Sequence, residues 1–179
     1  DALLSRGLGD VYKRQLQDDV RSLAGVPSWM LTLMNKLLET TGKKYIDEIW
    51  KNLEVYFHGG VSFKPYRTEF KNIISNKEFK YYEVYNASEG FFAIQDRNDS
   101  DELLLMLDYG IFYEFIEINN STKSEKIIDL SMVEVGVNYA LIITTNSGLW
   151  RYKIGDTIIF TNLKPFRIKI SGRTKHFIN

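Results

Sequence analysis

The first coherent pattern along the chain is helical. Hydrophobic residues recur at helical spacing from Trp29 to Leu38, with Pro27 in the place of a first-turn residue and Gly42 where the helix should end. A second helical pattern covers Pro65 to Ile74, whose apolar side chains fall on one face. Between them, Tyr45 to Trp50 is predicted to form a short helix.

The first strand pattern lies between the short helix and the helix at Pro65 to Ile74. Apolar and polar residues alternate from Leu53 to Phe57, which predicts a buried strand that ends at His58, before Gly59-Gly60. Tyr81 to Asp96 has an apolar run on each side of a polar elbow, Tyr85 to Gly90. A strand, a glycine turn, a helix and a second strand follow one another, which predicts a βαβ unit.

The pattern then becomes mostly β. Apolar strands are predicted at Leu103–Leu107, Ile111–Ile118, Tyr139–Thr145 and Gly148–Ile154. Thr157–Phe160 and Phe166–Ile170 predict a hairpin or a small distorted barrel, and Asn119–Lys126 is a polar loop. The predicted fold class is therefore α/β, with a βαβ part followed by a β-rich part.

Composition narrows the function classes. The chain has 179 residues, 44% hydrophobic and 14% aromatic, which suffices for a sizeable core. Acidic and basic residues number 23 each, so no overall charge would attract nucleic acid or an anionic membrane. There is no cysteine, and no apolar run reaches the length of a membrane helix. We expect a cytoplasmic protein; its oligomeric state is left open.

Residues 1–15, DALLSRGLGDVYKRQ, differ from the rest of the chain. They have little amphipathic order, two glycines and a basic end, and they resemble translated adapter sequence. We expect a non-native or disordered leader, with a flexible native leader as the alternative.

The elbow carries the first candidate chemistry. Tyr85 offers a flat face for a base, Ser88 a donor for a phosphate oxygen, and Glu89 an anion for a metal or a proton. Gly90 lets the backbone pass close to a ligand. The alternative is an ordinary β-turn with a capping serine and a solvated glutamate.

His58 and the two glycines after it have two interpretations. His58 could face a nucleotide while Gly59 and Gly60 let the backbone approach an adenine edge. Alternatively, His58 is a structural residue that ends a strand before a flexible turn.

Two further motifs follow near the end of the chain. Trp150 to Asp156 is predicted to end a strand with an acid just past a glycine, where a carboxylate can accept hydrogen bonds from both ribose hydroxyls. Ser171 to Lys175 is predicted to be a glycine-containing basic turn after the last strand, able to touch phosphate or ribose. Taken singly, a residue such as Asp156 is more often a turn residue, and one such as Lys175 a solvated charge.

In combination these motifs carry a resemblance. YNASEG, WRYKIGD and SGRTKHFIN resemble successive motifs of the adenylate-forming enzymes. FHGGVSFKPYR, YNASEGFFAIQD, LLLMLDYGIFYEFI and TTNSGLWRYKIGD resemble the GH3 auxin-responsive family in its bacterial form, whose plant members are acyl acid–amido synthetases. The likeness extends from about Val20 to Asn179.

The resemblance implies roles for single residues. It implies that Tyr85 stacks on adenine, that Asp156 holds the ribose hydroxyls, and that Ser88 with Glu89 serves the phosphate and its magnesium. The turn at Gly59-Gly60 would border the adenine.

The resemblance also implies roles for further residues of the elbow and of the segment from Ser171 to Lys175. Asn86 and Ala87 would belong to the nucleotide site, and Arg173 would lie near the nucleotide. Glu89 and Lys175 are the implied catalytic residues, with Lys175 at a hinge.

The resemblance also implies a domain division. Residues 16–171 would be part of the large adenylation domain, and 172–179 the start of the hinge to a C-terminal domain. The family's phosphate-binding loop and its C-terminal domain are expected to lie outside this chain. Residues 1–179 alone are therefore expected to show no ATP–pyrophosphate exchange.

Three functions remain open. The first uses ATP and Mg²⁺ to activate a carboxylic acid as an acyl-adenylate and conjugates it to an amino acid. The second passes the acyl group to coenzyme A. The third is a non-catalytic module that binds a nucleotide or a small acid.

Overall fold

The computed structural model describes residues 16, 18–98, 100–118 and 126–174. The chain divides into two compact units, Asp1–Glu83 and Val84–Asn179, called here the first and second units. Strand β3 (Lys80–Ala87) crosses this division, so its first half belongs to the first unit and its second half to the second.

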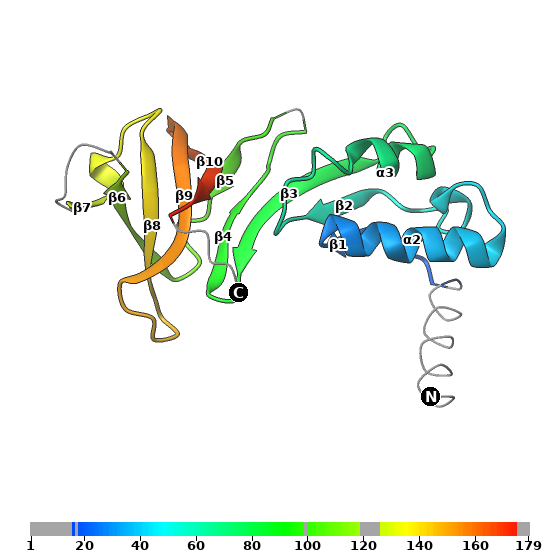
Figure 1. Ribbon diagram of the computed structural model, residues 1–179, viewed down its shortest axis with the longest axis horizontal. Helices are drawn as coiled ribbons and strands as arrows, with labels where there is room; N and C mark the ends of the chain where they lie inside the picture. Colours follow the sequence, from blue (N-terminus) through cyan, green and yellow to red (C-terminus); the bar gives the residue numbers. More distant parts are fainter. Residues whose placement is uncertain (1–15, 17, 99, 119–125, 175–179) are drawn as a thin grey trace. The chain divides into compact units, whose positions relative to one another are not determined.

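The first unit is built on three parallel strands (Figure 1). Strand β1 (Ser22–Gly25) pairs with β2 (Val55–His58), and β2 pairs with the first half of β3. Helix α2 (Pro27–Thr41) and the 3₁₀ turn η1 (Ile46–Glu48) connect β1 to β2, and α3 (Arg67–Ile73) connects β2 to β3. The predicted βαβ unit, β2-α3-β3, is confirmed, and a second one begins at β1, which the sequence pattern did not reveal.

Local signals and packing explain α2. Pro27 occupies the first turn, and Gly42 ends the helix with a left-handed φ of 66°. The side chains of Met34 and Leu37 are buried among the residues that cover the strands. Among the described residues, no helix has both the length and the apolarity needed to cross a membrane.

His58 lies in the aromatic core of the first unit. Its side chain is 2% exposed and stacks on Phe63, with ring centroids 4.1 Å apart. Its Nδ1 has no hydrogen-bond partner within the described part of the chain. Burial, with a smaller contribution from the positive charge of Arg67, lowers the pKa of His58 from 6.5 to about 4. The structural interpretation of this histidine therefore holds.

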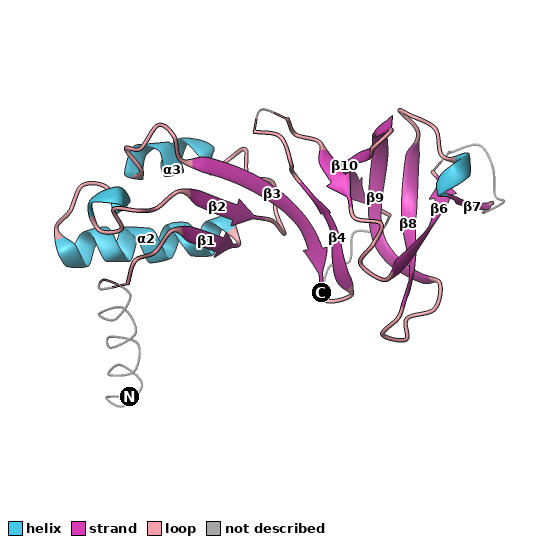
Figure 2. Ribbon diagram, turned by 180° about the vertical axis from the view of Figure 1, so that it is seen from behind, coloured by secondary structure: helices cyan, strands magenta, loops and turns pink. Residues whose placement is uncertain are grey.

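The second unit is an antiparallel sheet (Figure 2). Its strand order is β3-β4-β5-β10-β9-β8-β6-β7. The strands after β3 are β4 (Gly90–Ile94), β5 (Leu103–Leu105), β6 (Ile111–Glu117), β7 (Ile127–Asp129), β8 (Asn138–Thr145), β9 (Tyr152–Leu163) and β10 (Phe166–Arg173), and the 3₁₀ turn η2 (Leu130–Met132) follows β7. The predicted β-rich part is confirmed, including the hairpin formed by β9 and β10.

The core of the second unit shows that its sheet curls. One continuous cluster of buried side chains includes Tyr85 from β3, Tyr113 from β6 and Phe160 from β9. These strands are separated by others in the sheet order, so only a curved sheet can bring their inward faces into one core. The ring of Phe160 packs edge-on against that of Phe115, with centroids 5.2 Å apart.

Two boundary predictions in the second unit were wrong. Gly148–Arg151 is a connection, and β9 starts at Tyr152, so Asp156 lies inside a strand and does not end one. Ser171–Arg173 belongs to β10 and is not a turn after it. The glycines that suggested turns lie beside irregularities of the strand pairing, where Gly155 has a φ of 91°.

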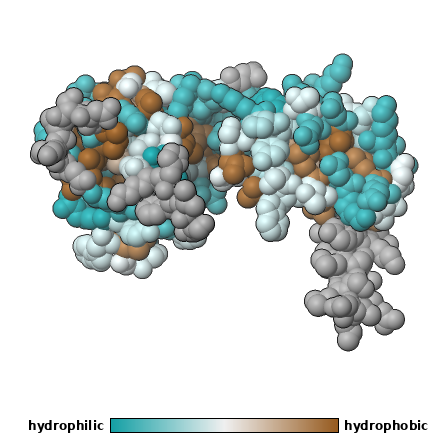
Figure 3. Space-filling model, viewed as in Figure 1, coloured by the Kyte–Doolittle hydropathy of each residue, from teal (hydrophilic) through white to brown (hydrophobic). Residues whose placement is uncertain are grey.

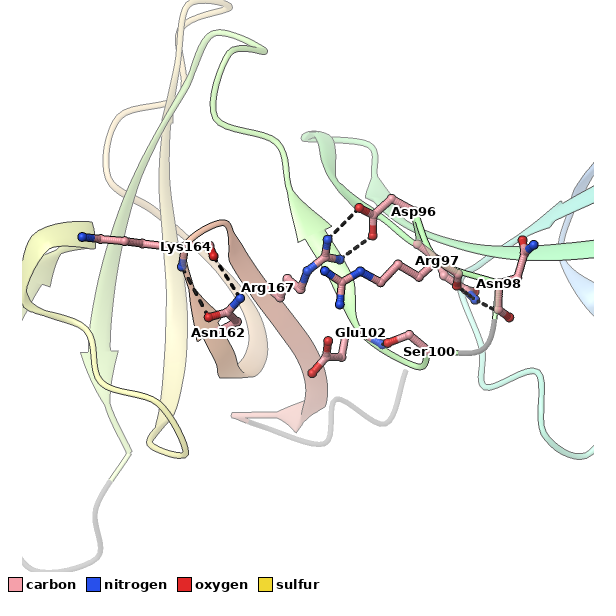
Figure 4. A network of polar contacts seen from close by, with 9 residues as sticks. Asp96, Arg97, Asn98, Ser100, Glu102, Asn162, Lys164 and Arg167 are labelled. Carbon is pink, nitrogen blue, oxygen red and sulfur yellow. Dashed lines mark hydrogen bonds and ion pairs between the residues drawn. The ribbon is translucent and has the colours of Figure 1, made fainter.

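An ion pair between a buried arginine and a partly exposed aspartate connects β10 to the residues just after β4 (Figure 4). The guanidinium of Arg167, whose side chain is 3% exposed, donates to both carboxylate oxygens of Asp96, and one of these contacts, Nη2 to Oδ2, measures 2.7 Å. Hydrogen bonding from Arg167 holds the pKa of Asp96 below its ordinary value. Arg97 and Glu102 lie beside this pair in Figure 4. Asp96 is the carboxylate that Arg167 contacts directly, and the charge of Glu102 makes a smaller favourable contribution.

Removing that carboxylate should destabilise the second unit. Asp96→Ala leaves the buried Arg167 without its counter-ion, and we expect it to lower the free energy of unfolding by about 2–4 kcal/mol, measured by urea denaturation. The matched control is Asp101→Ala, which breaks the solvent-exposed pair with Lys169 and should cost about 0.5 kcal/mol or less. Equal losses in the two variants would contradict this account.

His58 should make stability depend on pH. The folded protein resists protonation of His58 until about pH 4, whereas the unfolded chain takes up that proton near pH 6.5. Stability from this group is therefore complete above pH 6.5 and is lost as the pH falls toward 4, by about 3 kcal/mol in all. His58→Phe should flatten the curve of unfolding free energy between pH 7 and 4, and His176→Gln, which removes the other histidine of the sequence, is the control. Parallel curves for wild type and His58→Phe would exclude the effect.

Candidate functional site

The predicted elbow is the tip of a tight β-hairpin. Strand β3 ends at Ala87 and β4 begins at Gly90, so Ser88 and Glu89 form the turn between them. Ser88 is exposed and Glu89 is half-buried. A Cβ on Gly90 would lie 2.9 Å from Cδ1 of Ile111, which explains why this end of the turn has no side chain.

An irregularity beside the turn directs Tyr85 into the core. Tyr85 pairs with Ala93 and Asn86 with Phe91, which leaves Phe92 as an extra residue on β4. The ring of Phe92 is fully buried and packs against that of Tyr85, with centroids 4.9 Å apart. Tyr85 is consequently only 5% exposed.

A second irregularity positions Asp156. Toward β8, Thr157 pairs with Ala140 and Lys153 with Ile142, so the residues from Ile154 to Asp156 leave the regular ladder. Toward β10, Asp156 is paired with Arg173. The left-handed backbone of Gly155 makes this detour possible, because a residue with a side chain would be strained there.

Both oxygens of the Asp156 carboxylate have partners. The hydroxyl of Tyr85 donates to Oδ2 at 2.9 Å, and Nε of Arg173 donates to Oδ1 at 2.7 Å. The Asp156 side chain is 13% exposed, whereas that of Arg173 is 62% exposed. The carboxylate is thus held from the core by a buried phenol and from the solvent side by an exposed guanidinium.

The charges around Asp156 reinforce these contacts. The hydrogen bond to Asp156, followed by the charge of that carboxylate, raises the pKa of Arg173, and Glu89 makes a smaller contribution of the same sign. Burial, and then the charge of Asp156, raises the pKa of Tyr85. Tyr85 therefore stays protonated and remains a donor at neutral pH.

The structure brings together four of the predicted site residues, Tyr85, Glu89, Asp156 and Arg173, all in the second unit. Asn86, Ala87 and Ser88 are their neighbours along the hairpin. The stacking of Tyr85 on a base stays a prediction, and its ring is already enclosed by protein.

Two other predicted site residues belong to the first unit. Gly59 and Gly60 follow β2 in the first unit, so their place beside the adenine stays a prediction. Lys175 lies outside the described residues. Among the described residues there is no group of three or more acidic or histidine side chains that could hold a metal by itself. Glu89 offers one carboxylate, which suffices for a Mg²⁺ ion that is held mainly by phosphates.

One surface feature of the second unit was not predicted. A groove of about 540 Å³ is lined by residues of β6, of the end of β8 and of the loops beside them, including Leu107, Phe112, Thr144 and Trp150. Trp150 is 82% exposed. Figure 3 shows hydrophobic residues on the surface of each unit. The alternation within β6 could have indicated that Phe112 faces away from the core, because Tyr113 is buried.

Two family models match the chain. The model described as the GH3 family N-terminal domain matches residues 8–79, and the one described as the GH3 family central domain matches residues 104–173. The two matches fall on the first and second units respectively. The first of them begins inside the predicted leader.

Curated relatives give the same family. A probable indole-3-acetic acid-amido synthetase GH3.9 from Oryza sativa subsp. japonica is 34% identical over 80 residues, which is 43% of this chain and 18% of the relative. Indole-3-acetic acid-amido synthetase GH3.8 from Oryza sativa subsp. indica is 34% identical over 86 residues, or 44% of this chain and 14% of the relative. The chain thus spans less than a fifth of the length of these relatives.

Solved structures agree on the fold. The AtGH3.15 acyl acid amido synthetase in complex with 2,4-DB matches with a TM-score of 0.71 at 15% identity, covering 94% of this chain and 38% of that one. A 2-hydroxyisobutyryl-CoA ligase matches with a TM-score of 0.64 at 14% identity, covering 95% and 40%. The fold is therefore one that part of each of these two enzymes adopts, and the predicted α/β class is confirmed.

Proposed function

The chain belongs to the GH3 family, and we propose that the whole protein is an ATP-dependent acid–amido synthetase. In this reaction an oxygen of a carboxylic acid attacks the α-phosphorus of ATP and pyrophosphate leaves. The amino group of an amino acid then attacks the carbonyl carbon of the acyl-adenylate, and AMP leaves. The observation that carries the proposal is the pair of GH3 domain matches on one chain. Asp156 and Arg173 lie within the second match and contact each other, and Glu89 of the hairpin turn adds its charge to theirs.

Residues of the site have chemistry that suits a nucleotide. A carboxylate has about four lone-pair positions, so Asp156 can accept from a ribose diol in addition to Tyr85. Arg173 is exposed enough to turn toward a phosphate. The exposed hydroxyl of Ser88 can donate to a phosphate oxygen, and Asn86 and Ala87 would flank the nucleotide.

Magnesium would be bound between Glu89 and the phosphates of the nucleotide. When bound, Mg²⁺ neutralises phosphate charge during the displacement. The proposal further assigns Gly59 and Gly60 to the border of the adenine and a catalytic role to Lys175, both from the family resemblance. The cytoplasmic location is likewise part of the proposal.

A thioester-forming ligase is the second candidate. It is supported by the fold that the chain shares with the 2-hydroxyisobutyryl-CoA ligase. For this candidate, the activation step would use the same residues of the present chain. The two candidates differ only in the group that accepts the acyl chain, an amine or the thiol of coenzyme A. A binding module without catalysis is the third candidate, and the same experiments test it.

Neutralising Asp156 should weaken nucleotide binding. We expect Asp156→Asn in the whole protein to raise the Kd for ATP by roughly 10- to 100-fold, the scale of one or two charge-assisted hydrogen bonds. Asparagine keeps an acceptor for Tyr85, so stability should fall less than in Asp156→Ala, which leaves that buried hydroxyl unpaired. The matched control is Glu114→Gln, because Glu114 is 15% exposed and is likewise paired with an exposed arginine, Arg151. Unchanged ATP affinity in a folded Asp156→Asn protein would refute the ribose assignment.

The acceptor distinguishes the two enzymatic candidates. The whole protein should catalyse ATP–pyrophosphate exchange only when a carboxylic acid is supplied, because pyrophosphate release requires the attacking carboxylate. Adding an amino acid should then start the steady release of AMP without coenzyme A. A strict requirement for coenzyme A would favour thioester formation instead. Absence of exchange with a broad panel of acids would favour the binding module.

A further inference from the structure

The bond between Tyr85 and Asp156 is not part of the strand ladder. Strands β4, β5 and β10 lie between β3, which carries Tyr85, and β9, which carries Asp156. The 2.9 Å contact from Oη to Oδ2 therefore crosses the interior of the curled sheet. Nothing in the regular pairing of the sheet requires it.

The two partners of Asp156 differ in their freedom to move. Arg173 is largely exposed, and water can replace it on Oδ1 at small cost. The ring of Tyr85 is fixed by burial and by Phe92. A buried hydroxyl without a partner is unfavourable, so Asp156 is held in the orientation that satisfies it. Tyr85 is the rigid partner of the pair.

We infer that Tyr85 is a positioning residue: its hydroxyl fixes the Asp156 carboxylate so that the remaining acceptor positions are presented to the ribose diol. This inference rests on the proposed function, in which Asp156 binds the ribose. It gives Tyr85 a role through its hydroxyl, in contrast to the stacking of its ring on adenine. The two roles predict different effects on ribose recognition when the hydroxyl oxygen of Tyr85 is removed.

The experiment compares ATP with 2′-deoxyATP. In the whole protein, the Kd of each nucleotide is measured for wild type, Tyr85→Phe and Tyr113→Phe. Tyr113 is the matched control because it is also a buried core tyrosine, and its hydroxyl donates to the backbone oxygen of Met106 at 3.0 Å. Both variants lose one buried hydrogen bond and keep the ring, so their melting temperatures should fall to a similar extent.

Only Tyr85→Phe should change the recognition of ribose. We expect wild type and Tyr113→Phe to bind ATP at least roughly 10-fold more tightly than 2′-deoxyATP. In Tyr85→Phe that preference should fall to about 3-fold or less, through weaker binding of ATP. A Tyr85→Phe protein with the full wild-type preference would overturn the inference and leave stacking as the remaining role.

Two further variants separate the possible failures. Asp156→Asn should lose the ribose preference; if it does not, the proposed function of Asp156 fails, and the inference with it. Arg173→Ala alters an exposed side chain and keeps Tyr85 in place. Arg173→Ala should weaken the binding of ATP and of 2′-deoxyATP by a similar factor and keep the preference for ATP. This result tests the inference even if Tyr85→Phe does not fold. Loss of the preference in Arg173→Ala would show that Arg173 orients Asp156 and would overturn the inference.

Discussion

A largely buried carboxylate needs hydrogen-bond partners for its oxygens, and in the second unit this requirement applies to Asp156, whose side chain is 13% exposed. One of its donors, Tyr85, comes from a strand that three other strands separate from β9 in the sheet order. That donor reaches the carboxylate only because the sheet curls around a common core. The packing of Phe92, Tyr85 and their neighbours is therefore a condition for the geometry of the site, and the core and the candidate chemistry cannot vary independently.

The curl in turn depends on irregular strands. The extra residue Phe92 in β4 and the detour of β9 before Thr157 both interrupt the ladder next to a predicted site residue. Each irregularity interrupts the regular hydrogen bonding between strands. It also changes the direction of a side chain, which strict alternation would place on the other face of the sheet. Gly155 can take the backbone conformation that this detour needs, because its φ of 91° is unfavourable for residues with a Cβ.

Local features of the fold could be predicted from the sequence, and non-local ones could not. The position of α2 follows from the spacing of its apolar residues, Pro27 and Gly42, all within one segment. Gly155 was placed at a strand end because glycine favours turns and bulges alike, and only the partner strand distinguishes them. Strand β1 has a single buried residue, Leu23, so its sequence shows no apolar alternation. The resemblance identified Tyr85 and Asp156, yet the bond between residues 71 positions apart required the folded chain.

Strand β10 carries two arginine–aspartate pairs whose burial is reversed. In the pair of Arg167 and Asp96, the cation is 3% exposed and the anion 33%, so the arginine cannot leave without exposing the core. In the pair of Arg173 and Asp156, the anion is the buried partner and the cation is 62% exposed. A buried cation with one carboxylate partner favours a permanent structural link. A buried anion with an exposed cation keeps a polar acceptor in place while its outer partner can exchange for a ligand, and this asymmetry distinguishes the candidate site from the structural pair on the same strand.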